Sequence, residues 1–353
     1  MSDKVNILVL GVGGNVSQGI LKALAISSLP CRVVGACISP TAFGLFTVDR
    51  ALISPRAGDP GFIPWLIEVC KKERIAAILS GVEPVLDLLA RNAPLIRQET
   101  GAIPIVSAPD QLEIANDKLR TCEWLRDRGL HYPLFAAAAD HEAVERLALA
   151  VGFPLIGKPR CGKSSEGVVI IRNREELDRF VRHDSYVIEQ YLGTPDHEYT
   201  AACFSDSSGA VRGCITLRRE LLEGTTVRAE AGSFPDVRQE AIAIARELRP
   251  FGPCNLQMRR VGLHSVCFEI NLRFSGTTPI RARLGFNDVE ACLRHYVLNE
   301  PAIDLPVIEK GMATRYWNEL YLSSEPVDLL RKTGELDSPR SSPHVLEDYG
   351  NDR

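Results

Sequence analysis

The sequence predicts an α/β protein: a parallel-sheet N-terminal domain of the Rossmann-like kind, followed by a mixed α+β region. Residues 4–10 are typical of a buried strand, which ends in a glycine turn. A helix over 17–26 and a second strand over 32–38 follow, and this unit is typical of doubly wound sheets. Much further along, apolar and polar residues alternate strictly over 268–274, the period of a half-buried strand.

Composition excludes several classes of protein. The 353 residues allow two or three domains, and the 45% hydrophobic and 24% charged contents are ordinary for a soluble globular protein. A formal charge of −4 gives no reason to expect a nucleic-acid or membrane-surface partner. No apolar run approaches the roughly 18 residues of a membrane span, and no signal peptide is evident. Ten cysteines without a C-x-x-C pair favour reduced thiols in a cytoplasmic protein, with neither a zinc site nor disulfides.

The N-terminal glycine turn, Gly11-Val12-Gly13-Gly14-Asn15, resembles only part of a dinucleotide fingerprint. That fingerprint needs a third glycine and an acidic residue at the end of the second strand. Val16 stands at the third glycine position, and the second strand ends at Ser39-Pro40. The glycines are therefore better explained by a tight turn and close helix packing, and an NAD(P)-dependent oxidoreductase is the weaker alternative. The alternation continues to about Pro109, with helices over 61–73 and 82–91 and a strand over 76–79.

The middle of the chain contains a misleading motif. Residues 157–164 match the Walker A pattern G-x-x-x-x-G-K-[ST] letter for letter. A P-loop needs a helix that begins at the Lys-Ser/Thr pair, so that free N–H groups point at the phosphates. Here a β-branched run over 168–171 follows the strand over 153–158, which predicts strand–loop–strand, and we reject the Walker A interpretation. A glycine- and serine-rich loop between antiparallel strands can still cover phosphates as a flap.

The remaining elements follow from periodicity and turn residues. Asn116-Asp117 is predicted to cap a helix over 118–129. From Ser323 the chain is polar and rich in turn residues, so its end is expected to be poorly ordered. The other predicted elements are helices over 140–151, 174–183, 235–248 and 288–298, and strands over 186–192, 198–204, 211–216 and 314–321.

The alternating strand belongs to a predicted hairpin. The connection over 261–264 contains a glycine, and Gln257 and Glu269 are equidistant from Leu263, so a hairpin centred there places them opposite each other. Cross-strand partners lie about 4.5–5.5 Å apart at Cβ. Asn271 follows two residues along the same face, so the three oxygen-bearing side chains converge. Such a set of oxygen ligands suits a Mg²⁺ ion that is also bound to phosphate. The plainer alternative is an amphipathic strand whose polar face is solvated, with Phe268 and its alternate neighbours buried.

The order of these elements resembles the ATP-grasp superfamily, closest to its carbamoyl-phosphate-synthase-like and carboxylate–amine ligase branch, over residues 4–298. Lys118, at a helix start, resembles the first nucleotide-binding basic residue of that family. Lys158 resembles the second, which reaches the α and β phosphates. Two departures are visible: Leu272 replaces a proline often found between the family's asparagine and arginine, and Gln257 is neutral where many ligases carry a carboxylate.

The resemblance implies further roles. Residues 189–192 look like the hinge strand whose backbone meets adenine, and Glu198 falls where an acid accepts the ribose hydroxyls. Taken singly, each of these residues has a plainer explanation as a solvated or ion-paired side chain. The implied nucleotide-binding residues are Lys118, Lys158, Gly162, Lys163, Ser164, Ser165, Gly167, Glu189, Gln190, Tyr191, Leu192 and Glu198; the metal ligands are Gln257, Glu269 and Asn271; and the catalytic residues are Arg273, Lys158 and Arg218. The pairs Arg218-Arg219 and Arg281 with Arg283 could face phosphate or a substrate carboxylate.

The chemistry implied by the resemblance is ATP-dependent ligation. ATP and Mg²⁺ (two ions, with Mn²⁺ an acceptable substitute) would activate a small-molecule carboxylate as an acyl phosphate. An amine or ammonia would then attack, giving an amide, ADP and phosphate. A homodimer is compatible with this interpretation, and a nucleotide-binding regulatory module without ligation is the main rival. Cys161, in the flap, is a weak candidate for covalent chemistry.

The expected domain division has four parts. Residues 1–112 form the Rossmann-like pre-ATP-grasp domain, and 113–186 form the small lid subdomain. Residues 187–322 form the C-terminal subdomain that carries the metal site, and 323–353 form a polar tail.

Overall fold

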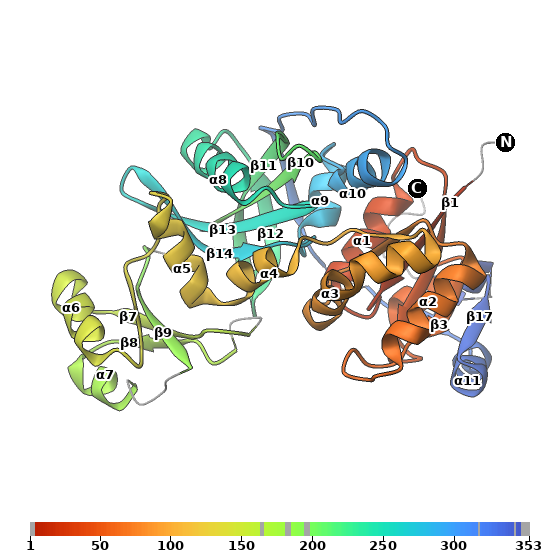
Figure 1. Cartoon of the computed structure of the whole chain (residues 1–353), viewed down its shortest axis with the longest axis horizontal. Helices are drawn as coiled ribbons and strands as arrows, with labels where there is room; N and C mark the ends of the chain where they lie inside the picture. The colour runs from red at the N-terminus through yellow and green to blue at the C-terminus, as the bar shows by residue number, and fades with distance from the viewer. Residues whose placement is uncertain are drawn as a thin grey trace.

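A computed structural model describes residues 4–162, 166–180, 185–193, 198–316, 318–341 and 344–346. Three predicted flap residues, Lys163, Ser164 and Ser165, lie outside the described residues. The chain forms an N-terminal α/β domain at one end, a large antiparallel sheet in the centre and a small four-stranded lobe at the other end (Figure 1).

The N-terminal domain is a doubly wound sheet, as predicted. Its strand order is β17-β3-β2-β1-β4-β5, and all neighbouring pairs are parallel except β17 with β3. The glycine turn is needed for packing: Gly11 has φ +70°, and a Cβ there would lie 2.3 Å from Val82 Cγ2. The elements are β1 Val5–Leu10, α1 Asn15–Ala25, β2 Cys31–Cys37, η1 Phe43–Phe46, β3 Arg50–Ile53, α2 Phe62–Glu73, β4 Ala77–Ser80, α3 Glu83–Thr100 and β5 Ile103–Pro104.

The end of the chain corrects one expectation. Residues 324–333 form helix α11, and β17 (Glu335–Asp337) pairs antiparallel with β3. The expected poor order is therefore wrong for this segment. Leu330 and Leu336 are buried in the same core cluster as the N-terminal sheet, and the buried Arg50 forms a 2.6 Å ion pair with Glu335. The segment is polar overall, so its few apolar residues gave no clear pattern. Their packing partners lie in the N-terminal sheet, almost 300 residues earlier.

Truncating Leu330 tests this docking. Leu330 is fully buried, so Leu330→Ala should lower the free energy of unfolding by about 2–4 kcal/mol. Its neighbour Leu329 is 44% exposed, so Leu329→Ala should cost less than about 1 kcal/mol. Urea unfolding of the two variants and the parent protein measures both values. Equal stability of the two variants would show that α11 does not pack on the sheet.

The four-stranded lobe carries the loop with the Walker-like letters. Its order is β6-β9-β7-β8, and every neighbouring pair is antiparallel. The described residues before and after the loop are strands β7 and β8, which confirms strand–loop–strand over the described part. The elements from the connection onward are α4 Pro109–Asn116, α5 Lys118–Asp127, β6 Phe135–Ala137, α6 His141–Val151, β7 Leu155–Pro159, β8 Val169–Ile171, α7 Arg174–Phe180 and β9 Tyr186–Gln190.

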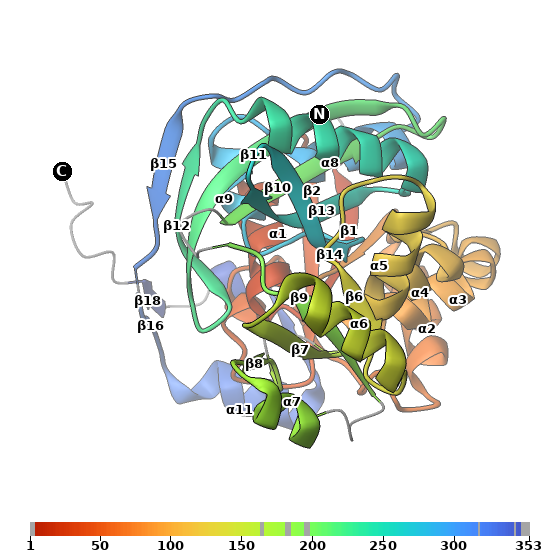
Figure 2. The ribbon, with the colours of Figure 1, turned by 90° about the vertical axis from the view of Figure 1, so that its left-hand side faces the viewer.

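The large sheet has the order β14-β13-β10-β11-β12-β15 and is antiparallel throughout. Helix α8 packs on one face of this sheet and the lobe stands over the other (Figures 1 and 2). Its elements are β10 Glu198–Ser205, β11 Val211–Leu222, β12 Thr225–Ala231, α8 Pro235–Leu248, β13 Pro253–Val261, β14 His264–Asn271 and β15 Gly311–Thr314.

Several predicted bounds differ here. The strand predicted over 314–321 is instead β15 and the separate strand β16, Leu320–Leu322, which pairs with β18, His344–Leu346. The predicted helix over 288–298 is α10, Asp288–Cys292, followed by the π-helical turn η3, Leu293–Val297. The polar loop after β14 leads into α9, Thr278–Arg283, and η4, Pro339–Ser341, follows β17. Within the described ranges, no helix has the length and apolar character needed to cross a membrane.

Candidate functional site

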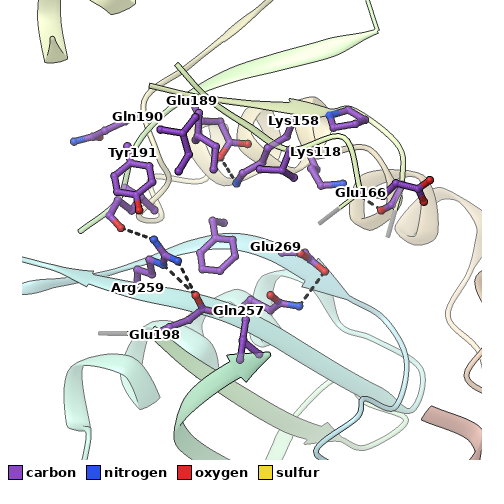
Figure 3. Close-up of a pocket in the computed structure, with 18 residues that line it drawn as sticks. Lys118, Lys158, Glu166, Glu189, Gln190, Tyr191, Glu198, Gln257, Arg259 and Glu269 are labelled. Carbon is purple, nitrogen blue, oxygen red and sulfur yellow. Dashed lines mark hydrogen bonds and ion pairs between the residues drawn. The ribbon is translucent and has the colours of Figure 1, made fainter. Parts of the chain in front are cut away.

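A cavity of about 370 Å³ lies between the four-stranded lobe and the large sheet (Figure 3). The lobe contributes its lysines and the β9 segment from one side, and the sheet contributes carboxylates and amides from the other. Most of the predicted site residues meet here, namely Lys118, Lys158, Gly162, Glu189, Gln190, Tyr191, Leu192, Glu198, Gln257 and Glu269.

A β-bulge sets the register of the hairpin. The turn pairs Val261 with His264, so its centre lies between Gly262 and Leu263 and not at Leu263 as predicted. On that register Gln257 would face Phe268. An irregularity between Gln257 and Met258 adds one residue to β14, so Gln257 pairs with Glu269 after all. The predicted opposition of Gln257 and Glu269 is confirmed, but the bulge produces it.

The bulge also places Phe268 and Glu269 on the same side of the strand. The prediction that Phe268 faces away from Glu269 is wrong, because both side chains line the cavity while Cys267 is fully buried. The Phe268 ring centre lies 5.0 Å from Lys158 Nζ and 5.8 Å from Arg259 Cζ. These distances are typical of cation–π contacts, so the ring forms an apolar floor between two cations.

Two of the three predicted metal ligands donate hydrogen bonds to one carboxylate oxygen of the third, Glu269. Gln257 Nε2 donates to Glu269 Oε1 over 3.0 Å, and Asn271 Nδ2 donates to the same oxygen over 2.8 Å. Among the described residues no group of three His, Cys, Asp or Glu side chains could hold a metal. One carboxylate with two amides is a hard oxygen donor set, which fits Mg²⁺ whose remaining ligands are phosphate and water.

Lys158 is held by a buried ion pair. Its Nζ lies 2.6 Å from Glu189 Oε2, and the two residues are only 8% and 0% exposed. The resemblance assigned Glu189 a backbone role; its side chain positions the lysine as well. Cys122 Sγ is 3.9 Å from the other oxygen of Glu189, and burial together with that carboxylate raises the pKa of the Cys122 thiol. Cys122 is therefore a neutral packing residue at this point.

Lys118 is positioned by its neighbour Asp117. The Asp117 carboxylate accepts the N–H of Leu119, which caps α5, and binds Arg160 at the end of β7 over 2.6 Å. The backbone N–H of Lys118 donates to the Arg160 carbonyl over 2.9 Å. Lys118 Nζ then reaches the carbonyl of Gly162 over 3.3 Å. These contacts join the start of α5 to the flap and bring Lys118 to the cavity.

The pKa of Asp117 yields a test of this junction. Burial alone would raise the pKa of Asp117, but the hydrogen bonds from Arg160 and from the α5 backbone outweigh burial and lower it. The stabilisation from the carboxylate is therefore complete above the ordinary aspartate pKa of about 3.9 and is lost as pH falls through the lowered value. Asp117→Asn keeps the cap and should cost about 1 kcal/mol at pH 7.

Denaturant unfolding of Asp117→Asn and the parent protein between pH 7 and pH 3 measures this difference. The two proteins should approach equal stability at the acid end. Asp127→Asn, which removes an exposed carboxylate beside Arg126 on the same helix, serves as control and should change stability little at any pH. A difference for Asp117→Asn that is as large at pH 3 as at pH 7 would contradict the assignment.

Glu198 lies in the cavity as predicted, but two arginines occupy its oxygens. Arg219 donates to Oε1 over 2.8 and 3.2 Å, and Arg259 donates to Oε2 over 2.8 and 3.2 Å. An ionised carboxylate offers about four acceptor positions, and these bonds use them all. A ribose hydroxyl could reach Glu198 only by displacing one of these bonds. Arg259 also donates to the Leu192 carbonyl over 2.9 Å.

The structure separates the two adjacent arginines of β11. Arg219 is 8% exposed, and its Nη2 donates to Gln257 Oε1 over 2.6 Å. Arg218 points to the opposite side of the strand and pairs with Glu230. Both arginines border a second cavity of about 420 Å³, and neither lines the 370 Å³ cavity, which Arg219 meets only through its bonds to Glu198 and Gln257. Arg218 therefore does not line the 370 Å³ cavity, and its catalytic role stays a prediction. Of the predicted pair, Arg219 is the member that contacts Glu198 and Gln257. Strand alternation shows that the two differ, but not which one faces inward.

Two further arginines are engaged elsewhere. Arg273 lies just beyond the end of β14 and donates to Glu83 Oε1 at the start of α3 over 2.9 Å, and it does not line the 370 Å³ cavity. Arg281 is fully buried and lies 2.6 Å from Asp288, so it does not face a substrate.

In the flap, Gly167 has φ +73°, and a Cβ there would lie 2.9 Å from Pro159 Cγ. Cys161 is exposed.

Comparison with known proteins agrees with this arrangement. The family model described as "PylC-like, N-terminal domain" matches residues 7–104, and the model described as "ATP-grasp domain" matches residues 115–257. Together they cover more than half of the chain, including the lobe, both lysines and Gln257. Residues 115–257 belong to the ATP-grasp domain family.

Two solved structures share this ATP-grasp fold. N5-carboxyaminoimidazole ribonucleotide synthetase from Thermus thermophilus has a TM-score of 0.67 at 21% identity, over 87% of this chain and 81% of that one. The biotin carboxylase domain of the Hydrogenobacter thermophilus 2-oxoglutarate carboxylase has a TM-score of 0.68 at 17% identity, over 91% and 75% of the two chains.

A curated relative is much longer. The carbamoyl phosphate synthase large chain of Ralstonia nicotianae is 24% identical over 316 residues, which are 79% of this chain but 28% of the relative. The chain thus matches less than a third of that protein.

Proposed function

We propose that this protein is an ATP-dependent ligase that activates a carboxylate as an acyl phosphate for attack by an amine or ammonia. The observation that carries the proposal is that Gln257 and Glu269 line the cavity that also receives Lys118 and Lys158, with Asn271 bonded to Glu269 from outside the cavity lining. Cationic side chains on one wall and hard oxygen ligands on the other fit a metal-bound phosphate chain.

The cavity supports specific nucleotide contacts. The lysines suit the α and β phosphates, and the backbone after β9, from Gln190 to Leu192, suits the adenine edge. Phe268 provides an apolar surface beside the base or sugar. The flap glycine Gly162 lines the cavity and accepts a hydrogen bond from Lys118 Nζ through its carbonyl oxygen.

The chemistry rests on charge. A carboxylate is a poor electrophile, and an amine does not displace oxide from it at neutral pH. Phosphoryl transfer gives the carboxylate a good leaving group, and the transfer depends on positioning and on neutralising the phosphate oxygens. Bound Mg²⁺, as two ions or with Mn²⁺ in its place, would supply that neutralisation from Glu269, Asn271 and Gln257. Arg273, released from Glu83, could reach the transferring group, and the flap would exclude water.

The neighbouring structures support the coarser part of this proposal. The Hydrogenobacter biotin carboxylase domain was solved as a dimer with MgADP, ADP and bicarbonate. We propose that this chain likewise binds nucleotide and Mg²⁺. We propose further that its substrates are a small-molecule carboxylate and an amine, and that it forms a homodimer.

Glu269 tests the metal assignment. Glu269→Gln removes the only carboxylate of the predicted ligand set and should lower ATP turnover at least about 100-fold, the loss typical when a charge-stabilising group leaves a transition state. The far-UV spectrum and unfolding midpoint should stay close to those of the parent protein. Glu230→Gln, on the outer side of β12 and paired with Arg218, is the matched control and should keep turnover. An unchanged rate for Glu269→Gln would remove the metal assignment.

A phosphate-release screen with ATP and Mg²⁺ against paired carboxylic acids and amines tests the reaction class. Phosphate release that requires both an acid and an amine supports ligation. Nucleotide binding without turnover for any pair would favour a regulatory module, and an NADPH-induced thermal shift would favour the oxidoreductase.

A further inference from the structure

Arg219 links the two ends of the cavity. Its Nη2 donates both to Glu198 Oε1 over 2.8 Å and to Gln257 Oε1 over 2.6 Å. Gln257 in turn donates to Glu269 over 3.0 Å. A continuous polar chain therefore runs in the order Arg259, Glu198, Arg219, Gln257, Glu269. Arg219 does not itself line the cavity, and Figure 3 shows the other four members.

The contact with Gln257 uses the atom that a metal would need. A hard cation binds an amide through its carbonyl oxygen, because the amide nitrogen has no free lone pair to offer. In this structure Arg219 occupies that oxygen, while the amide nitrogen faces Glu269. The Gln257 oxygen has two acceptor positions and Arg219 uses one of them, so a cation that binds the other either lies beside the Arg219 guanidinium or displaces it.

The local charge also opposes cation binding at Gln257. Arg219 is 8% exposed, so its charge is poorly screened by water. Glu198 faces two guanidinium groups, and the trio of Glu198, Arg219 and Arg259 carries a net charge of about +1 beside the predicted metal ligands. A divalent cation is repelled by that charge as well as hindered by the hydrogen bond.

We infer that Arg219 is a positioning residue that withholds Gln257 from metal until nucleotide phosphates are bound. This inference rests on the proposed function. Phosphate oxygens provide anionic acceptors for a displaced guanidinium and share the metal with Glu269, so nucleotide and metal bind with positive coupling. Removing Arg219 strengthens metal binding by the protein alone and weakens the coupling.

Mn²⁺ titration followed by electron paramagnetic resonance, which counts free Mn²⁺, tests the inference without measuring activity. In the absence of nucleotide, Arg219→Met should bind Mn²⁺ about tenfold more tightly than the parent protein, the order expected when a nearby like charge is removed. Arg218→Met is the matched control, because it removes the same charge from the adjacent residue on the outer side of the strand. Its Mn²⁺ affinity should stay within about twofold of the parent value.

Mn²⁺ binding by folded Arg219→Met that is no tighter than that of the parent protein would overturn the inference, and so would equal gains for the two arginine variants. Arg219→Lys covers the case in which the methionine variant does not fold. A lysine keeps the charge but lacks the planar fork that serves Glu198 and Gln257 together, so a smaller gain of about threefold is expected. Unchanged binding by the folded lysine variant would equally overturn the inference.

A second titration with a non-hydrolysable ATP analogue separates the two proposals. Parent protein that takes up no Mn²⁺ beyond the amount bound by the analogue alone would overturn the proposed function and the inference with it. Uptake with the analogue, combined with no gain for Arg219→Met in its absence, would overturn the inference alone. With the analogue present, the difference between Arg219→Met and the parent protein should shrink.

Discussion

The β-bulge at Phe268 is the constraint on which the cavity floor depends. A one-residue change of register moves every side chain of a strand to the other face. Without the bulge, Phe268 would stand opposite Gln257, and Glu269 would turn toward the face that packs on α8. That face is lined by Leu256, Met258 and other buried apolar residues, where a carboxylate would have no partner. A single extra residue in β14 therefore decides whether a polar site exists.

The floor of the cavity is stabilised as a network. Glu198, Lys158 and Glu189 are each less than a tenth exposed, and each forms an ion pair at 2.8 Å or closer. Breaking one member of a buried pair typically costs several kcal/mol, because the partner is left charged in a poorly solvated place. Such pairs stay in place unless an incoming group supplies an equivalent charge.

Much of the fold and part of the site could be predicted from sequence, because the signals are local. The β1–α1–β2 unit follows from hydrophobic period and glycines within about 35 residues. The capping residue and the strand end predict the elements that carry Lys118 and Lys158, and the family resemblance singles out the two lysines. Arg219 could not be chosen over Arg218, because the registry of β11 depends on an irregularity between Phe204 and Ser205 in the neighbouring strand. The bulge at Phe268 similarly leaves no mark in the period of the strand.

Long-range partners explain the other misses. Strand β17 is only three residues long and polar, and it pairs with β3, itself too short to predict, across a separation of 287 residues from Arg50 to Asp337. Neither strand is recognisable from its own sequence, because what defines each is the pairing with the other and the ion pair of the buried Arg50 with Glu335. The same holds at the site: the ion pair between Arg219 and Glu198 exists only because the sheet brings β11 and β10 together. Residues whose role is to position a ligand-binding side chain are thus the ones that local patterns miss, because their defining property is a partner elsewhere in the chain.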